Sequence, residues 1–411
     1  MAETAAMRET AKGLFRVAVA AADPDQAVRR FASAHGLKAA QAGRTLLLAF
    51  GKAAPAMARA ALDNLPPETE ALVITHHENA QDVQGATVMT AGHPVPDAAG
   101  AAAARALIAR MPPLTDNDRV IALVSGGASA LLPAPPKGIS LNDKQALNSA
   151  LLASGLDIVQ MNLVRQQVSD LKGGGLLRLA APAPVQALIL SDVIGDDLRA
   201  IASGPTVAPL GTRRAAKDVL QAAAVWEGLP APIKLHLPQN TQIPDTPSAE
   251  NHLIGSNRVS LEAMRTASQA VIVSDALVGD VEDAALQVAE HARTAAPGTY
   301  LFGGETTVVL KGNGKGGRNQ ELAARVAQAL DSESRPWIFL SGGTDGRDGP
   351  TDAAGGITDA GTFARARAAG VDPDALLANN DSYALLKAAG DLLITQATGT
   401  NVADVQVLIL G

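Results

Sequence analysis

Cysteine is absent from this chain of 411 residues, and aromatic residues make up only 2% of it. Without cysteine, the protein has no disulfide, no thiol nucleophile and no cysteine-ligated zinc or iron–sulfur site. The scarcity of aromatic side chains argues against nucleic-acid binding by base stacking, and the net charge of −7 argues against binding to a phosphate backbone. We therefore expect no nucleic-acid partner.

Long hydrophobic runs are missing as well. No run of about 18 apolar residues occurs without a charged or turn residue, so we expect no membrane span. Residues 1–12 mix acidic and basic side chains and lack the apolar core of a signal peptide. The expected location is the cytoplasm.

Apolar residues nevertheless account for 47% of the chain, and its length predicts two domains. Short, continuously apolar segments alternate with longer Ala- and Leu-rich helical segments. The clearest expected strands of the first half are Thr45–Phe50, Ala71–Thr75, Thr87–Met89, Val120–Val124 and Val185–Leu190. This alternation predicts an α/β fold with a parallel sheet covered by helices on both faces.

A proline-rich stretch, Leu229–Pro247, interrupts the alternation and is interpreted as a linker. We place the domain boundary near residue 245, which gives domains of residues 1–245 and 246–411. One alternative stays open, in which the C-terminal tail packs on the first domain.

The segment Ser125–Ala130 is rich in glycine and serine and directly follows an expected strand. Its small residues allow the backbone to approach a phosphate group, and Ser125 and Ser129 add hydroxyl donors. We assign nucleotide phosphates to Ser125, Gly126, Gly127 and Ser129. The alternative is a tight strand-to-helix turn without a ligand.

Charged residues follow two other expected strands. Lys52 comes after Thr45–Phe50, where a lysine can offset the charge of a transferring phosphoryl group or pair with a carboxylate. Asp192 and Asp196 follow Val185–Leu190 and suit Mg²⁺, which takes one or two carboxylates plus substrate phosphates. The alternatives are a solvated lysine and a solvated acidic turn.

The second half concentrates glycine and charge in three clusters, Gly303–Thr307, Gly314–Glu321 and Ser341–Gly346. Expected strands at Val308–Leu310 and Trp337–Leu340 separate the clusters, so the pattern predicts an anion site at strand ends. Gly316 and Gly317, followed by Arg318, are expected to contact phosphate. One of the carboxylates Asp345, Asp348 and Asp352 is expected to orient a hydroxyl group or accept its proton, and an ordinary loop of Asx-turns is the alternative.

Gly312, Gly314 and Gly317 also form a literal G-x-G-x-x-G, the fingerprint of dinucleotide binding. That fingerprint expects an acidic residue at the end of the next strand, about 20 residues further on. The acid at this spacing, Asp331, precedes the expected strand Trp337–Leu340 instead of following it. We interpret the fingerprint as coincidental.

Taken in order, these motifs resemble the type II glycerate kinases, the family whose C-terminal part is the MOFRL domain. The resemblance is carried by Gly51–Ala53, Gly92–Asp97, Ser125–Leu131, Ser191–Asp196, Ser203–Thr206, Gly255–Asn257, Gly303–Thr307, Gly316–Glu321, Gly343–Ala354 and Thr398–Val402. It implies a larger, Rossmann-like N-terminal domain, a smaller C-terminal α/β domain, and an active site in the cleft between them. It also implies ATP-dependent phosphorylation of D-glycerate to 2-phosphoglycerate, with Lys52, Arg318 and Asp345 at active-site positions.

Within the matched motifs, we assign substrate binding to His93, Asn257, Glu305 and Asn319. The expected cofactors are ATP and Mg²⁺, and the expected partners are D-glycerate and the nucleotide. The oligomeric state stays open, with a homodimer as one alternative. Two other functions remain: an NAD(P)H-dependent hydroxypyruvate reductase, a label that some relatives carry, and a non-catalytic protein that binds a sugar acid or a nucleotide.

Overall fold

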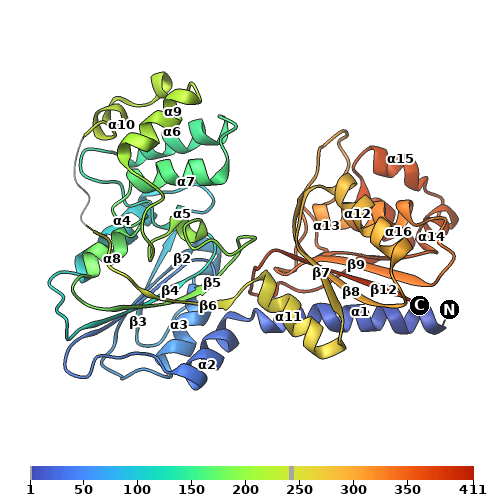
Figure 1. The fold of residues 1–411 in the computed structure, drawn as a ribbon, viewed down its shortest axis with the longest axis horizontal. Coiled ribbons are helices and arrows are strands. Elements are labelled where there is room, and N and C mark those ends of the chain that lie inside the picture. Colours follow the sequence, from blue (N-terminus) through green and yellow to red (C-terminus); the bar gives the residue numbers. More distant parts are fainter. Residues whose placement is uncertain (1, 240–244) are drawn as a thin grey trace. The chain divides into compact units, whose positions relative to one another are not determined.

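The computed structural model describes residues 2–239 and 245–411, and the chain divides into two compact units (Figure 1). The parallel-sheet unit is Pro24–Ile254. The mixed-sheet unit combines the N-terminal segment up to Asp23 with Gly255–Gly411. An α/β architecture with two sheets is thereby confirmed.

This division differs from the predicted boundary near residue 245. The N-terminal segment belongs with the second half of the chain, and strand β6 (Glu250–Gly255) extends the first sheet beyond that boundary. The predicted linker is also partly helical, because Ala231–His236 forms helix α10. Pro232 lies in the first turn of α10, where a missing N–H costs nothing. Residues 240–244 of the predicted linker lie outside the described residues.

The parallel-sheet unit is built on six strands in the order β3-β2-β1-β4-β5-β6. This order is that of doubly wound, Rossmann-like sheets. Strands β1 to β5 each run parallel to their neighbours. Their bounds are β1 Thr45–Phe50, β2 Glu70–His76, β3 Ala86–Ala91, β4 Arg119–Val124 and β5 Val185–Leu190.

Both faces of this sheet are buried, as the continuous apolar pattern predicts. Leu46, Leu48 and Phe50 of β1 point to a core shared with helices α4 (Ala98–Arg110) and α8 (Gly175–Ala180). The opposite face is covered by α3 (Ala54–Leu62), on which α2 (Pro24–His35) packs.

A second, purely helical core lies in the same unit (Figure 1). It brings together α6 (Leu141–Leu152), α7 (Ile158–Gln167), α9 (Arg213–Ala222) and α10. Helices α6 and α7 begin at capping boxes, in which Ser140 pairs with Asp143 and Asp157 pairs with Gln160. Leu147 and Leu151 of α6 are buried in this core.

The mixed-sheet unit contains six strands in the order β11-β10-β9-β12-β8-β7. The strands are β7 Val271–Asp280, β8 Gly298–Thr307, β9 Trp337–Gly343, β10 Gly355–Asp359, β11 Leu392–Leu393 and β12 Asp404–Leu410. The C-terminal strand β12 lies between β9 and β8 and runs antiparallel to both. The C-terminal tail is therefore a strand in the interior of this unit's own sheet.

Helices cover this sheet on both faces (Figure 1). The N-terminal helix α1 (Ala2–Ala21) buries Ala11, Leu14, Phe15 and Ala18, a spacing typical of one helical face, against β9 and β12. The other helices are α11 Asn257–Ser268, α12 Val281–Thr294, α13 Arg318–Ala329, α14 Thr362–Ala368, α15 Pro373–Ala378 and α16 Ser382–Ala389.

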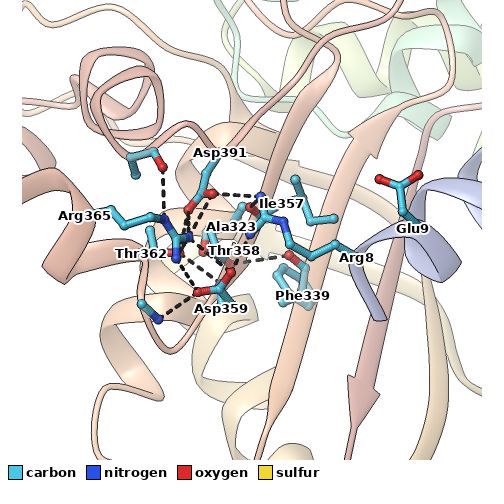
Figure 2. Close-up of polar contacts among 12 residues, drawn as sticks. Arg8, Glu9, Ala323, Phe339, Ile357, Thr358, Asp359, Thr362, Arg365 and Asp391 are labelled. Carbon is cyan, nitrogen blue, oxygen red and sulfur yellow. Dashed lines mark hydrogen bonds and ion pairs between the residues drawn. The ribbon is translucent and has the colours of Figure 1, made fainter. Parts of the chain in front are cut away.

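An ion-pair network fastens α1 to this unit, as Figure 2 shows. The guanidinium of Arg8 contacts Asp359 at 2.6 Å and Asp391 at 2.7 Å. Arg365 contacts the same two carboxylates at 2.8 and 2.7 Å. Two arginines thus share two buried aspartates, and the first helix is joined to chain more than 340 residues away.

The strand predicted at Val308–Leu310 is wrong. Strand β8 ends at Thr307 and contains the whole cluster Gly303–Thr307, which the glycines suggested was a loop. The glycines serve packing instead, because a Cβ atom at Gly304 would lie 2.2 Å from the carbonyl oxygen of Leu277 on the neighbouring strand.

Candidate active-site residues

The carboxyl ends of β1 and β4 lie side by side, since Phe50 pairs with Val124. The backbone N–H of Lys52 donates to the carbonyl of Gly126 at 2.9 Å, and the side-chain amide of Asn79 donates to the carbonyl of Lys52 at 2.7 Å. The strand order reverses between β1 and β4, and doubly wound sheets bind ligands at such a point. Lys52 and the predicted phosphate loop therefore occupy the expected ligand position of this unit.

The two glycines of the loop are surrounded by predicted site residues. A Cβ atom at Gly126 would lie 2.1 Å from Oδ2 of Asp192. Gly127 has φ +83°, and a Cβ atom there would lie 3.1 Å from Cγ of Lys52 and 3.2 Å from Cδ2 of His93. Only glycine fits both positions, and the structure brings five of the predicted residues together.

The hydroxyls of the loop are used inside the protein. Oγ of Ser125, which is only 1% exposed, accepts the backbone N–H of Ala53 at 3.1 Å. Oγ of Ser129 accepts a hydrogen bond from Nζ of Lys172 at 2.8 Å and lies 2.9 Å from Oγ of Ser203. Both serines therefore support the loop from inside the protein, and their contact with phosphate stays a prediction.

Burial shifts the titration of two residues beside the loop. It lowers the pKa of His93 to about 4, with the charge of Lys52 acting in the same direction, so His93 is neutral at pH 7. It raises the pKa of Asp192, and Lys52 partly opposes this. A buried carboxylate that is hard to ionise favours a cation next to it.

Asp196, the second predicted metal ligand, follows Asp192 in the same loop and has a left-handed backbone with φ +54°. Among the described residues, no group of three or more His, Asp or Glu side chains could hold a metal ion by itself. One or two carboxylates suffice for Mg²⁺ when substrate phosphates complete its shell. Asp192 fits that donor set.

A cavity of about 280 Å³ opens beside the loop in the same unit. His93, Gly127 and Ser129 line it, together with apolar side chains of α6 and with Val168, which follows α7. Three cationic side chains that the sequence analysis did not select also line it: Lys144, Arg165 and Lys172.

Arg318 and Asp345 lie in the other unit. Arg318 is the first residue of α13, and its guanidinium forms a bidentate contact with Asp404 at 2.5 and 3.0 Å. A further nitrogen of Arg318 contacts Glu305 at 2.7 Å. Burial opposes the charge of Arg318, but the hydrogen bonds and the charge of Asp404 outweigh it and raise the pKa. The arginine is therefore held, charged, in one orientation.

A cavity of about 680 Å³ collects most of the predicted residues of this unit. Gly316, Gly317, Arg318 and Asp345 all line it. Oδ1 of Asp345 accepts the backbone N–H of Arg347 at 3.0 Å, which is the Asx-turn that was the alternative interpretation. The turn fixes Asp345 at the cavity wall through Oδ1, and the other carboxylate oxygen, Oδ2, takes no part in the turn.

Asp348, three residues further on, caps the start of α13. Its carboxylate accepts the backbone N–H groups of Asn319 and Gln320 at 3.1 and 2.8 Å. Burial raises the pKa of Asp348 to about 6 despite these two hydrogen bonds, and the charge of Asp404 adds to the rise. Asp348 is one of the three carboxylates considered for the hydroxyl group, whereas Asp404 was not selected, because its partner Arg318 is distant in the sequence.

Two predicted substrate ligands are buried within the mixed-sheet unit. The amide of Asn257 donates to the carbonyls of Val402 and Asp404 at 3.0 and 2.7 Å. Oδ1 of Asn319 accepts the hydroxyl of Ser341 at 2.6 Å. These contacts give Asn257 and Asn319 a structural role, whereas Glu305 is half-exposed beside Arg318.

The G-x-G-x-x-G segment is packed against residues 379–382. The N–H groups of Lys311 and Gly312 donate to Oδ1 of Asn380, and the N–H of Gly314 donates to the carbonyl of Asn379. Dinucleotide fingerprints use such N–H groups and close backbone approach to bind pyrophosphate. Here the N–H groups of Lys311, Gly312 and Gly314 are bonded to the protein itself, which agrees with the interpretation of the fingerprint as coincidental.

Comparison with known proteins relates the chain to two family models. Residues 10–238 match a domain of unknown function, DUF4147, and residues 298–404 match the MOFRL family. The glycerate 2-kinase of Pyrococcus horikoshii is 37% identical, over 98% of this chain and 97% of that protein. The chain belongs to the MOFRL-containing glycerate kinase family.

Solved structures agree with this family. The crystal structure of glycerate kinase from Thermotoga maritima has a TM-score of 0.92 and 37% identity, covering 99% of this chain and 100% of that one. A protein of Agrobacterium vitis, provisionally named a hydroxypyruvate reductase, is 38% identical over 98% of this chain and 94% of its own length.

Within residues 2–239 and 245–411, no helix is long and apolar enough to cross a membrane.

Proposed function

We propose that the protein transfers the terminal phosphoryl group of ATP to the 2-hydroxyl of D-glycerate, giving 2-phosphoglycerate. The observation that carries the proposal is the gathering of Lys52, His93 and Asp192 around the Gly126–Gly127 turn. Family membership supports it, since relatives along the whole chain are named glycerate 2-kinase or glycerate kinase.

The residues of the parallel-sheet unit suit phosphoryl transfer. This reaction depends on positioning and on charge stabilisation more than on covalent chemistry, so no nucleophilic side chain is required. Lys52 offsets negative charge on the transferring group, and the Gly126–Gly127 turn admits phosphate oxygens close to the backbone. Neutral His93 offers one nitrogen donor and one nitrogen acceptor to a substrate hydroxyl.

Asp192, with Asp196 as a second ligand, is our proposed site for Mg²⁺. Burial raises the pKa of Asp192, and a neighbouring cation would stabilise its ionised form. Together with the nucleotide, Asp192 and Asp196 would hold the ion, which would supply positive charge to offset that of the phosphates.

In the mixed-sheet unit, we assign Arg318 to anion binding and Asp345 to orienting or deprotonating the 2-hydroxyl. The bidentate hydrogen bonds from Arg318 to Asp404 support this role, because a cation that is already held in one orientation loses little conformational freedom when it binds an anion. Gly316 and Gly317 line the same cavity and leave room for the ligand. Asn257 and Asn319 hold this wall in shape.

The test is ADP release by the purified protein with ATP and Mg²⁺, comparing D-glycerate, L-glycerate and no acid. We expect release that depends on D-glycerate. A parallel reaction with NADH and hydroxypyruvate tests the reductase alternative, and oxidation of NADH with no ADP release would replace the proposal. Binding of glycerate without turnover of either cofactor would favour the non-catalytic alternative.

A further inference from the structure

Three cationic side chains surround the small cavity of the parallel-sheet unit. Lys144 comes from α6, Arg165 from α7, and Lys172 from the loop after α7. The two lysines are 8% and 5% exposed, respectively. No aspartate or glutamate lines this cavity, and none of the three cations forms an ion pair within the described part of the chain. Buried charges are costly when they lack an opposite charge.

Their protein partners are neutral. Nζ of Lys144 donates to the carbonyls of Pro133 and Val168, and Arg165 donates to Oδ1 of Asn148 at 2.7 and 3.1 Å. Burial lowers the pKa of Lys144 to about 7, although the charge of Asp170 partly opposes this fall. Burial lowers the pKa of Lys172 well below its usual value, and the charges of Lys144 and Arg165 act in the same direction. An anion in the cavity would supply the missing charge.

A hydrogen-bond chain sets the direction of the protons around Ser129. Nζ of Lys172 donates to Oγ of Ser129 at 2.8 Å, and Oγ of Ser203 donates to Oδ1 of Asn162 at 3.2 Å. Because lysine only donates and Oδ1 only accepts, the hydroxyl proton of Ser129 points to Ser203, 2.9 Å away. Ser129 has no proton left for a ligand.

The ammonium group of Lys172, in contrast, has an N–H group that a ligand can use. It uses two N–H groups on the carbonyl and the hydroxyl of Ser129, both at 2.8 Å. No third acceptor for it occurs among residues 2–239 and 245–411, and the side chain lines the cavity. Its third N–H is therefore available to a bound anion.

Resting on the proposed kinase activity, we propose that this cavity binds the hydroxy-acid substrate, with its carboxylate on Nζ of Lys172 and with Ser129 as the positioning residue. The volume of about 280 Å³ suits a three-carbon acid, whereas pockets for larger ligands reach about 1,000 Å³. Leu147 and Leu151 cover the carbon chain. His93 and Gly127 line the same cavity and lie beside Lys52, so the substrate is bound next to the lysine that acts on the phosphoryl group.

The test combines steady-state kinetics with calorimetric titration of D-glycerate in the absence of nucleotide. Lys172→Met removes the charge and keeps the length of the side chain. We expect KM and Kd for D-glycerate to rise about 10- to 100-fold, as for the loss of a charge-assisted hydrogen bond, with KM for ATP unchanged. Ser129→Ala should act in the same direction but more weakly.

Ala130→Leu fills the cavity while keeping Lys172, and should weaken glycerate binding even if Lys172→Met does not fold. Lys234→Met is the matched control, because Lys234 pairs with Glu227 on the surface of the same unit. Unchanged glycerate binding in both cavity variants would overturn the proposal. So would a rise in KM for ATP instead, or titration of inorganic phosphate in place of glycerate, since either result would mark a phosphate site.

The two proposals fail in different ways. If the protein releases ADP with D-glycerate but the cavity variants keep their KM for the acid, the kinase activity stands and the binding site is wrong. If D-glycerate binds in a manner that depends on Lys172 but no ADP forms, the binding site stands and the kinase activity is wrong.

Discussion

Replacing Asp348 by asparagine should change how the stability of the mixed-sheet unit depends on pH. Asp348 is 3% exposed, and burial raises its pKa to about 6 in the folded protein, against 3.8 for an unperturbed aspartate. Between these two values, the folded state binds a proton that the unfolded state has lost. The free energy of unfolding of the parent protein therefore falls as the pH rises from about 4 to about 6.

The size of this effect follows from the two pKa values. A difference of about two units corresponds to about 3 kcal/mol at 1.36 kcal/mol per unit. Asp348→Asn has no such proton, so its stability relative to the parent should increase by about 3 kcal/mol between pH 4 and pH 7. At low pH the asparagine should be the less stable of the two, because the amide nitrogen that replaces Oδ2 cannot accept the N–H of Gln320.

The two tryptophans allow this unit to be measured by itself. Trp337 is buried in β9 of the mixed-sheet unit, whereas Trp226 lies in the parallel-sheet unit. In a Trp226→Phe background, fluorescence during urea unfolding reports on Trp337 alone. Asp331→Asn, which removes an exposed carboxylate of the same unit, controls for the loss of one charge. Parallel pH profiles for Asp348→Asn and its parent would refute the reasoning and would mean that the two capping N–H groups keep Asp348 ionised.

Four further substitutions test other parts of the structure. Lys52→Met and Arg318→Met should each lower kcat about 100-fold or more, the loss typical of one preorganised charge-stabilising group, and near-normal turnover in both would remove the proposed active site. Arg8→Met should destabilise the mixed-sheet unit by about 3 kcal/mol or more in urea unfolding, because two buried aspartates would share one arginine. Arg16→Met, on the exposed face of the same helix, is its control, and equal effects of the two would contradict the role of the network. Gly126→Ala should displace Asp192 and lower kcat about 100-fold, whereas Gly228→Ala, with no atom within 4 Å, should not.

Much of the parallel sheet could be predicted because each strand is locally apolar and buried on both faces. Val185–Leu190 was predicted with the bounds that the structure gives, and Thr45–Phe50 likewise. Strand β8 was missed because its glycines are required by a neighbouring strand, which local sequence does not encode. The placement of α1 was missed for the same reason, since Arg8 meets its carboxylates only in the folded unit.

The residues of the candidate site also differ in whether the local sequence indicates them. Lys52 and Gly126 could be found because each follows a recognisable strand. Lys144 was overlooked although a signal existed, since it lies three and seven residues before Leu147 and Leu151, on the buried face of α6. A lysine at such a position indicates a cavity or a partner. Asp404 gave no local signal, because it begins the central strand and meets Arg318 only through the sheet.

The measurement that tests the central claim most directly is the phosphorus NMR spectrum of the product formed from ATP, Mg²⁺ and D-glycerate. Phosphate on the 2-hydroxyl couples to a single carbon-bound proton, so the account predicts a new doublet that appears together with ADP. A triplet, from phosphate on the 3-hydroxyl, would contradict the proposed position of transfer, and the absence of any phosphate ester would contradict the kinase itself.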